Sequence, residues 1–132
     1  MAVTQFDHVN LRTAHLDRLV AFYHEVLGLE PGERPPFPFG GCWLYCDGLA
    51  VLHLVEVETQ PETSQPRLEH FAFRAEGLSD FLAELRARKI AYNVRVVPGY
   101  ETRQVNIHDP DGNHVHIDFG KHEEADLSAF AG

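Results

Sequence analysis

The sequence is poor in cysteine, in basic residues and in tryptophan. Its 132 residues include two cysteines, one tryptophan, and 11 basic against 20 acidic residues, for a formal net charge of -9. Cys42 and Cys46 are too few for a disulfide framework, and their Cys-x3-Cys spacing is a weak metal signal. The shortage of lysine and arginine argues against nucleic acid and anionic membranes as partners, because phosphate binding needs clustered basic side chains.

Long apolar runs are also missing. No stretch approaches the roughly 18 apolar residues of a membrane span. The opening residues, MAVTQFDHVN, lack the basic and then apolar pattern of a secretory signal. We therefore expect a cytoplasmic protein with reduced thiols and no membrane partner. A chain of 132 residues with 44% hydrophobic residues suits one domain with a core of its own.

One pattern of elements is written twice along the chain. FDHVNLRT alternates as a strand does, and the apolar spacing of HLDRLVAFYHEVLGLE predicts a helix that Gly28 closes. A Pro- and Gly-rich loop or broken strand follows, and then CWLYCDG and LAVLHLVEVE predict two strands. LEHFAFRA predicts the next strand, and GLSDFLAELRARKIAY predicts a helix with Ser79 as its N-cap. NVRVV, RQVNIHD and HVHIDF complete the second copy as strands.

The two copies keep nearly constant register. His8 and His70 lie 62 residues apart, as do Arg12 and Arg74, and His53 and His116 lie 63 apart. We therefore predict an α+β fold in which two pseudo-symmetric βαβββ modules form a curved mixed-sheet cup. The modules span residues 5–57 and 68–119 of a single domain, 1–132, with a linker at 58–67. The tail, 120–132, is expected to be either loose or packed on a partner.

Strand parity places most of the histidines on the sheet faces that the helices leave uncovered. The first strands would contribute His8, Asn10, Arg12, His70, Ala72 and Arg74 to the cup lining, and the last strands Val51, His53, Val55, His114, His116 and Asp118. Each module then offers one imidazole from its first strand and one from its last. Four converging imidazoles favour one divalent metal per cup, although each histidine taken alone is equally well read as a satisfied or surface side chain.

The stretches DHVNLRT, FYHEVLGLE, GCWLYCDGLAVLHLVE, LEHFAFRAEGL and IHDPDGNHVHIDF resemble the vicinal oxygen chelate superfamily. That superfamily includes glyoxalase I, fosfomycin- and bleomycin-resistance proteins and extradiol dioxygenases. The resemblance covers residues 5 to 119. It implies paired βαβββ modules, a homodimer whose cups are built within one chain or from both, and a small-molecule substrate. Carried over by position, it also implies metal ligands at His8, His53, His70 and His116.

His116 stands where this superfamily normally has a glutamate. A site of four histidines would be a stronger Lewis acid and a poorer base. It also departs from the two-histidine, one-carboxylate triad of non-haem iron oxygenases. Asp118, on the same strand face, is a candidate either to support His116 or to act as base, and His108 is a second candidate base or a surface histidine.

The expected function is that of a metal-dependent, glyoxalase-like lyase or isomerase. Its substrate would present vicinal oxygens to Zn, Ni, Fe, Co or Mn and react through a metal-stabilised enolate. One alternative is an extradiol-type iron dioxygenase. Another is a non-enzymatic small-molecule binding protein of the bleomycin-resistance kind, although such a protein has no need of four cup histidines.

Several polar and aromatic residues are candidates for the substrate pocket. Arg12 and Arg74 suit a carboxylate or phosphate, or else a salt bridge at the sheet rim. Phe37 and Phe39 of RPPFPF suit a lid or pocket wall, or else a dimer contact. Asn10, Gln104 and Asn106 complete the set by parity, whereas the direction of Trp43 and Tyr45 stays open because the preceding Gly-Gly permits a bulge.

Overall fold

The repeated pattern of alternation folds into two separate sheets. A computed structural model, which describes residues 1–132, divides the chain into the units Met1–Ser64 and Gln65–Gly132. Each unit holds four strands and one helix in the order strand, helix, strand, strand, strand. The α+β fold of two βαβββ modules is therefore confirmed.

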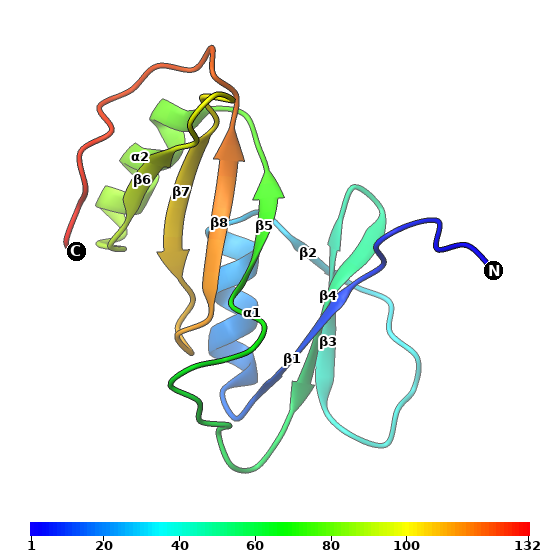
Figure 1. Cartoon of the computed structure of the whole chain (residues 1–132). Helices are drawn as coiled ribbons and strands as arrows, with labels where there is room; N and C mark the ends of the chain where they lie inside the picture. The colour runs from blue at the N-terminus through cyan, green and yellow to red at the C-terminus, as the bar shows by residue number, and fades with distance from the viewer. The chain divides into compact units, whose positions relative to one another are not determined.

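The first unit forms a mixed sheet with the strand order β1-β4-β3-β2 (Figure 1). Its elements are β1 (Val9–Thr13), α1 (Leu16–Glu25), β2 (Glu30–Gly32), β3 (Gly41–Cys46) and β4 (Leu49–Glu56). β1 runs parallel to β4, because the chain returns through α1, whereas the β2–β3 and β3–β4 pairs are antiparallel.

The core of the first unit lies between one face of this sheet and α1. Leu44, Leu52 and Leu54 are fully buried on the sheet, and α1 buries Leu19, Phe22 and Tyr23. Gly28 takes a left-handed conformation (φ 72°) and donates its N–H to the carbonyl of His24 at 3.0 Å. Gly28 therefore closes the helix as the sequence predicts.

The second unit repeats this layout with the strand order β5-β8-β7-β6. Its elements are β5 (His70–Arg74), α2 (Leu78–Ala87), β6 (Asn93–Val96), β7 (Arg103–His108) and β8 (His114–Phe119). β5 is parallel to β8, and the other pairs are antiparallel. α2 buries Leu78, Leu82 and Leu85, and its Phe81 ring lies 5.7 Å from the ring of Phe119 on β8.

The start of α2 differs from the prediction. The N-cap is Gly77, which has a left-handed backbone (φ 93°), and not Ser79. A glycine has no side chain with which to accept from the free N–H groups of the first turn. Glu123 of the tail does so instead, because its Oε1 accepts from the N–H groups of Gly77 and Leu78 at 2.9 and 2.8 Å.

The tail is neither loose nor free for a partner at these points. After β8 it turns back along the β6 side of its own unit (Figure 1). Besides the cap from Glu123, Phe130 and Tyr92 exchange a pair of backbone hydrogen bonds at 2.9 and 3.0 Å. The tail is therefore a structural part of the second unit. Neither helix of the chain has the length and apolar character needed to cross a membrane.

The turn before β8 is built by one aspartate. Asp109 is buried, and its Oδ1 accepts from the backbone N–H groups of Asp111 and Asn113, while Oδ2 accepts from the side chain of Asn113. Gly112 supplies the positive φ of 89° that the turn requires. DPDGN therefore fixes where β8 begins, and with it which side chains of HVHIDF share a face.

Candidate metal centre

In each unit the candidate ligand histidine of the last strand lies on the sheet face that the helix does not cover. Cross-strand pairing puts His53 of β4 opposite Asn10 of β1 and Trp43 of β3. In the second sheet the same row joins His116 of β8 to Ala72 of β5 and Asn106 of β7. Residues directly opposite one another share a face. The shared face predicted for these positions therefore holds within each sheet.

In the first unit His53 lies between two other rings. Its imidazole stacks on His8 (centroids 3.7 Å apart, planes at 14°) and on Trp43 (3.8 Å, 8°). His53 is 8% exposed, so little of it meets solvent. The stack also settles the direction of Trp43, which shares the face of the histidines.

Hydrogen bonds fix which nitrogen of each ring remains available. Nε2 of His53 donates to the carbonyl of Ala50 at 3.0 Å, and Nδ1 of His8 donates to the carboxylate of Asp7 at 2.6 Å. Burial, helped by the neighbouring His8, lowers the pKa of His53. A neutral His53 therefore keeps a lone pair on Nδ1, which is the form that binds a metal.

The second unit places His70 and His116 together, with ring centroids 4.5 Å apart. Nδ1 of His116 donates to Oδ1 of Asp118 at 2.6 Å, and His116 is 6% exposed. Nδ1 of His70 donates to the carboxylate of Glu69. As in the first unit, each ring has one nitrogen in a hydrogen bond and one without. In His70 and His116 the nitrogen without a hydrogen bond is Nε2.

The chemistry of these four histidines fits a divalent transition metal. Metal-binding histidines usually donate their second nitrogen to a carboxylate or a backbone carbonyl, which sets the tautomer and raises the basicity of the ligating nitrogen. His8, His70 and His116 donate to carboxylates and His53 donates to a carbonyl. Each of the four predicted ligands therefore has one oriented nitrogen and one nitrogen available for an ion.

Glu69 is a site residue that the sequence reasoning missed. Parity would assign it to the opposite face from His70, but it lies one residue before β5 begins, so strand alternation does not fix the direction of its side chain. Its carboxylate accepts from His70 and lies 3.1 Å from Nδ1 of His114. These contacts lower the pKa of Glu69. His114 was expected on this face but not as a candidate ligand.

The two candidate bases differ in their surroundings. Asp118 lies beside the candidate metal ligand His116, and its carboxylate accepts a hydrogen bond from Nδ1 of that ring. His108, at the end of β7, is exposed, and its ring stacks on His114 with centroids 5.3 Å apart. Of the two, only His108 has a side chain that forms no hydrogen bond.

The polar pocket candidates fall into two groups. Asn10, Arg12 and Arg74 are exposed, and neither arginine forms the ion pair considered as the alternative for them. Asn106 is half-buried, and its amide joins Gln104 to His114. Its Nδ2 donates to the Gln104 carbonyl at 3.2 Å, and its Oδ1 accepts from Nε2 of His114 at 2.8 Å.

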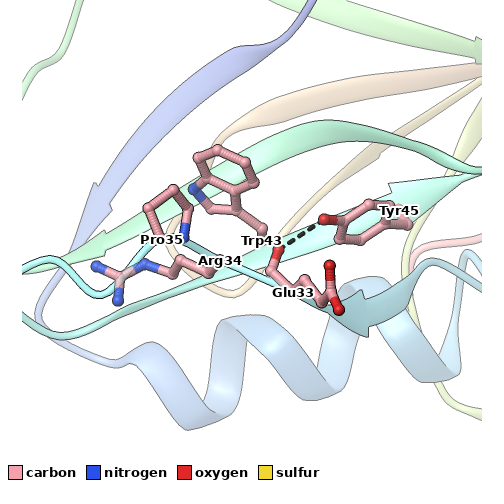
Figure 2. A pocket seen from close by; sticks show the side chains of 5 residues that line it. All are labelled: Glu33, Arg34, Pro35, Trp43 and Tyr45. Carbon is pink, nitrogen blue, oxygen red and sulfur yellow. Dashed lines mark hydrogen bonds between the residues drawn. The ribbon is translucent and has the colours of Figure 1, made fainter.

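An open hollow of ≈ 530 Å³ lies on the first unit (Figure 2). Its lining residues are Glu33, Arg34, Pro35, Trp43 and Tyr45. The Tyr45 hydroxyl donates to the Glu33 carbonyl at 2.6 Å, which is the dashed contact in Figure 2. Trp43 therefore has one ring face on His53 and also borders the hollow.

Phe37 and Phe39 do not line this hollow. Their rings stack on one another with centroids 5.1 Å apart, and both side chains are largely exposed. The Arg34 guanidinium lies 5.1 and 5.2 Å from the two ring centroids and donates to the Phe39 carbonyl at 2.8 Å. The two phenylalanines thus position the side chain of Arg34, and Arg34 in turn lines the hollow.

Comparisons with known proteins agree with this architecture. A family model described as Glyoxalase/Bleomycin resistance protein/Dioxygenase superfamily matches residues 5–117. The chain is 31% identical over 123 residues to Glyoxylase I 4 of Arabidopsis thaliana, covering 87% of this chain and 70% of that protein.

Solved structures give the same fold at lower identity. A glyoxalase family protein from Bacillus anthracis is 22% identical with a TM-score of 0.76, covering 92% of this chain and 98% of that one. A lactoylglutathione lyase from Agrobacterium tumefaciens is 24% identical with a TM-score of 0.69, covering 92% and 97%. At such identities these likenesses establish the fold alone.

Proposed function

Because this chain belongs to the Glyoxalase/Bleomycin resistance protein/Dioxygenase superfamily, we propose that it is a metal-dependent enzyme of the glyoxalase type. The reaction is a lyase or isomerase step on a small substrate with two neighbouring oxygens, in which a proton moves at the carbon beside a carbonyl. One observation carries the proposal: each of four imidazoles has one nitrogen fixed by an oxygen and the other left for a ligand bond.

The proposed metal ligands are His8 and His53 from the first unit and His70 and His116 from the second. When bound, a divalent ion such as Zn, Ni, Fe, Co or Mn supplies a Lewis acid that polarises the substrate carbonyl. A homodimer in the cytoplasm is part of the proposal, following the family resemblance. So is a single glyoxalase-like domain made of the two modules.

We propose different roles for the two candidate bases, Asp118 and His108. Asp118 orients His116, because its carboxylate already accepts from Nδ1 of that ring. His108 transfers the substrate proton, because it is exposed on the same face and its ring nitrogens make no competing hydrogen bond. Histidine is well suited to that task near neutral pH.

The substrate is proposed to contact the uncovered sheet faces. The hollow beside Trp43 offers aromatic and apolar surface to the organic part of a substrate. Arg12 and Arg74 are unpaired guanidinium groups, which suit a carboxylate or phosphate substituent. Asn10, Gln104 and Asn106 supply amide groups on the same faces.

The direct test measures proton exchange at the carbon beside a carbonyl. This step can be followed with simple model substrates. Protein purified without chelators is analysed for metal and incubated in D₂O with a panel of α-hydroxycarbonyl compounds, and deuterium entry beside the carbonyl is followed by NMR. Bound metal and exchange are expected in the wild type, and His53→Asn should lose the exchange and bind less metal than the wild type. His15→Asn, which alters a histidine outside the site, is the matched control.

Other outcomes would select the rival functions. Bound iron together with oxygen uptake on a catechol would replace the proposal with an extradiol-type dioxygenase. Absence of metal after reconstitution with each ion, combined with tight binding of a small molecule, would indicate a binding protein of the bleomycin-resistance kind. Metal content and exchange that are both unchanged in His53→Asn would contradict the assigned ligands.

A further inference from the structure

The second unit holds a cluster of ligand atoms that the proposed catalytic set does not use together. One ring nitrogen of His70, one of His114 and a carboxylate oxygen of Glu69 all lie within 4.8 Å of one another. We propose that Glu69, His70 and His114 form a separate site for a divalent transition metal, held entirely by the second unit. Neither Glu69 nor His114 occupies a ligand position implied by the family resemblance.

The strongest support is the arrangement of oxygens around His114. Oδ1 of Asn106 lies 2.8 Å from its Nε2, and both carboxylate oxygens of Glu69 lie 3.1 Å from its Nδ1. A neutral imidazole carries a single N–H and satisfies one of these acceptors only. A positive charge therefore belongs between Nδ1 of His114 and Glu69, in the form of a second ring proton or a metal ion.

The amide of Asn106 decides which nitrogen of His114 keeps the proton. Its Nδ2 donates to the carbonyl of Gln104 at 3.2 Å, so its Oδ1 is the atom that faces the ring. An amide in this orientation accepts from Nε2–H and leaves the lone pair of Nδ1 directed at Glu69. Asn106 thus acts as the orienting partner that metal-binding histidines usually have.

The donor set determines the class of ion. Two imidazoles and one carboxylate suit Zn²⁺ and its neighbours Co²⁺, Ni²⁺ and Cu²⁺, whereas Mg²⁺ and Ca²⁺ prefer oxygen ligands alone. The Glu69 carboxylate accepts from His70 and lies 3.1 Å from Nδ1 of His114, so it faces both imidazoles. The side chains of Glu69 and His70 are 67% and 42% exposed, which leaves open positions for water or a further ligand.

His70 is the one residue common to this site and the proposed catalytic set. Its Nδ1–H donates to Glu69 and its Nε2 has no hydrogen bond, so the two sites compete for the one free nitrogen of this ring. The inference does not depend on the proposed function, because Glu69, His114 and Asn106 are not metal ligands in that proposal. Variants at His114 therefore test this site alone, variants at Glu69 also remove the acceptor of His70, and variants at His53 test the other site.

The experiment is a calorimetric titration of the metal-stripped full chain with Zn²⁺ at pH 7.5, in the wild type and in a His53→Asn background. Binding is expected to persist in His53→Asn. Adding Glu69→Gln or His114→Asn to that background should weaken it at least about tenfold, and Asn106→Ala should weaken it by about tenfold. Glu76→Gln, an exposed carboxylate elsewhere in the same unit, is the matched control.

A second measurement reads the site directly. In a ¹⁵N spectrum of the histidine rings, Zn²⁺ should shift Nδ1 of His114 while Nε2 keeps its proton. Zn²⁺ binding that is equal in His53→Asn with and without Glu69→Gln, or a His114 ring that does not respond to Zn²⁺, would overturn the inference. Loss of all binding in His53→Asn alone would overturn it too, and would leave the four-histidine proposal standing.

Discussion

The two units share topology and register, but different neighbouring groups surround the equivalent histidines of their last strands. His53 and His116 occupy the same place in the two sheets, each opposite the first strand of its module and the third. The residue opposite on the third strand is Trp43 in the first unit and Asn106 in the second. His53 is consequently enclosed by rings, whereas His116 is held by the carboxylate of Asp118.

This difference shows two ways in which the environment sets the protonation and orientation of an imidazole. In the first unit, burial in an aromatic stack disfavours the charged form, so the pKa of His53 falls. In the second unit, carboxylates accept from Nδ1 of His70 and His116 and fix their orientation. The pseudo-symmetric scaffold sets the positions, and the neighbouring side chains set the protonation and rigidity of each pair.

The largest expected effect comes from removing the carboxylate that orients His116. Asp118→Ala should weaken metal binding by about 10- to 100-fold, because the ring loses its fixed tautomer and orientation. Calorimetric titration with Zn²⁺ measures this, in a His114→Asn background that removes the separate site and leaves the acceptor of His70 in place. Asp118→Asn keeps an acceptor and should lie between the wild type and Asp118→Ala. An unchanged affinity in both variants would refute the orienting role.

The sequence predicted the fold well because periodicity and the repeat are local signals. Alternation placed His53 and His116 on one face, and the 63-residue offset linked them. Contacts that depend on side-chain reach were not predictable in this way. The carboxylate of Glu69, one residue before β5, accepts a hydrogen bond from His70. Glu123 caps a helix 45 residues away in the sequence. Ser79 looked like the cap because its residue type is common there, but the tail supplies the acceptor instead.

The tail supplies the second prediction, since the first unit has no counterpart to it. Glu123→Ala should lower the free energy of unfolding by about 1–2 kcal/mol, because two N–H groups at the start of α2 lose their acceptor. Urea denaturation measures the loss. Glu124→Ala, one residue further along the tail, is the control and should change little. Equal stability of the two variants would show that the cap is not needed.

A third prediction breaks the aromatic stack that distinguishes the first unit. Trp43→Leu should cost about 1 kcal/mol of unfolding free energy beyond the apolar area it removes, since the ring contact with His53 is lost. Asn106→Leu, at the equivalent place in the second sheet, removes no ring stack and serves as the comparison. Trp43 is the only tryptophan, so its fluorescence in the wild type should also change if a metal binds to His53 as proposed.

The smallest expected effect is a pH dependence that belongs to the first unit. Burial lowers the pKa of His53 in the folded protein. As the pH falls through the unfolded value of about 6.5, the unfolded chain therefore takes up a proton before the folded chain does. The stability that a neutral His53 preserves is fully present above that value and is lost as the pH drops towards the lowered pKa.

Urea denaturation of metal-free protein between pH 8 and pH 5 should accordingly show a fall in stability that is shallower in His53→Gln. His15→Asn is the control and should keep the wild-type slope, since that histidine lies outside the stack. If His53→Gln and the wild type fall in parallel, burial in the stack does not set the protonation of His53. The contrast between the two units would then reduce to their hydrogen bonds: a carbonyl for His53 and a carboxylate for His116.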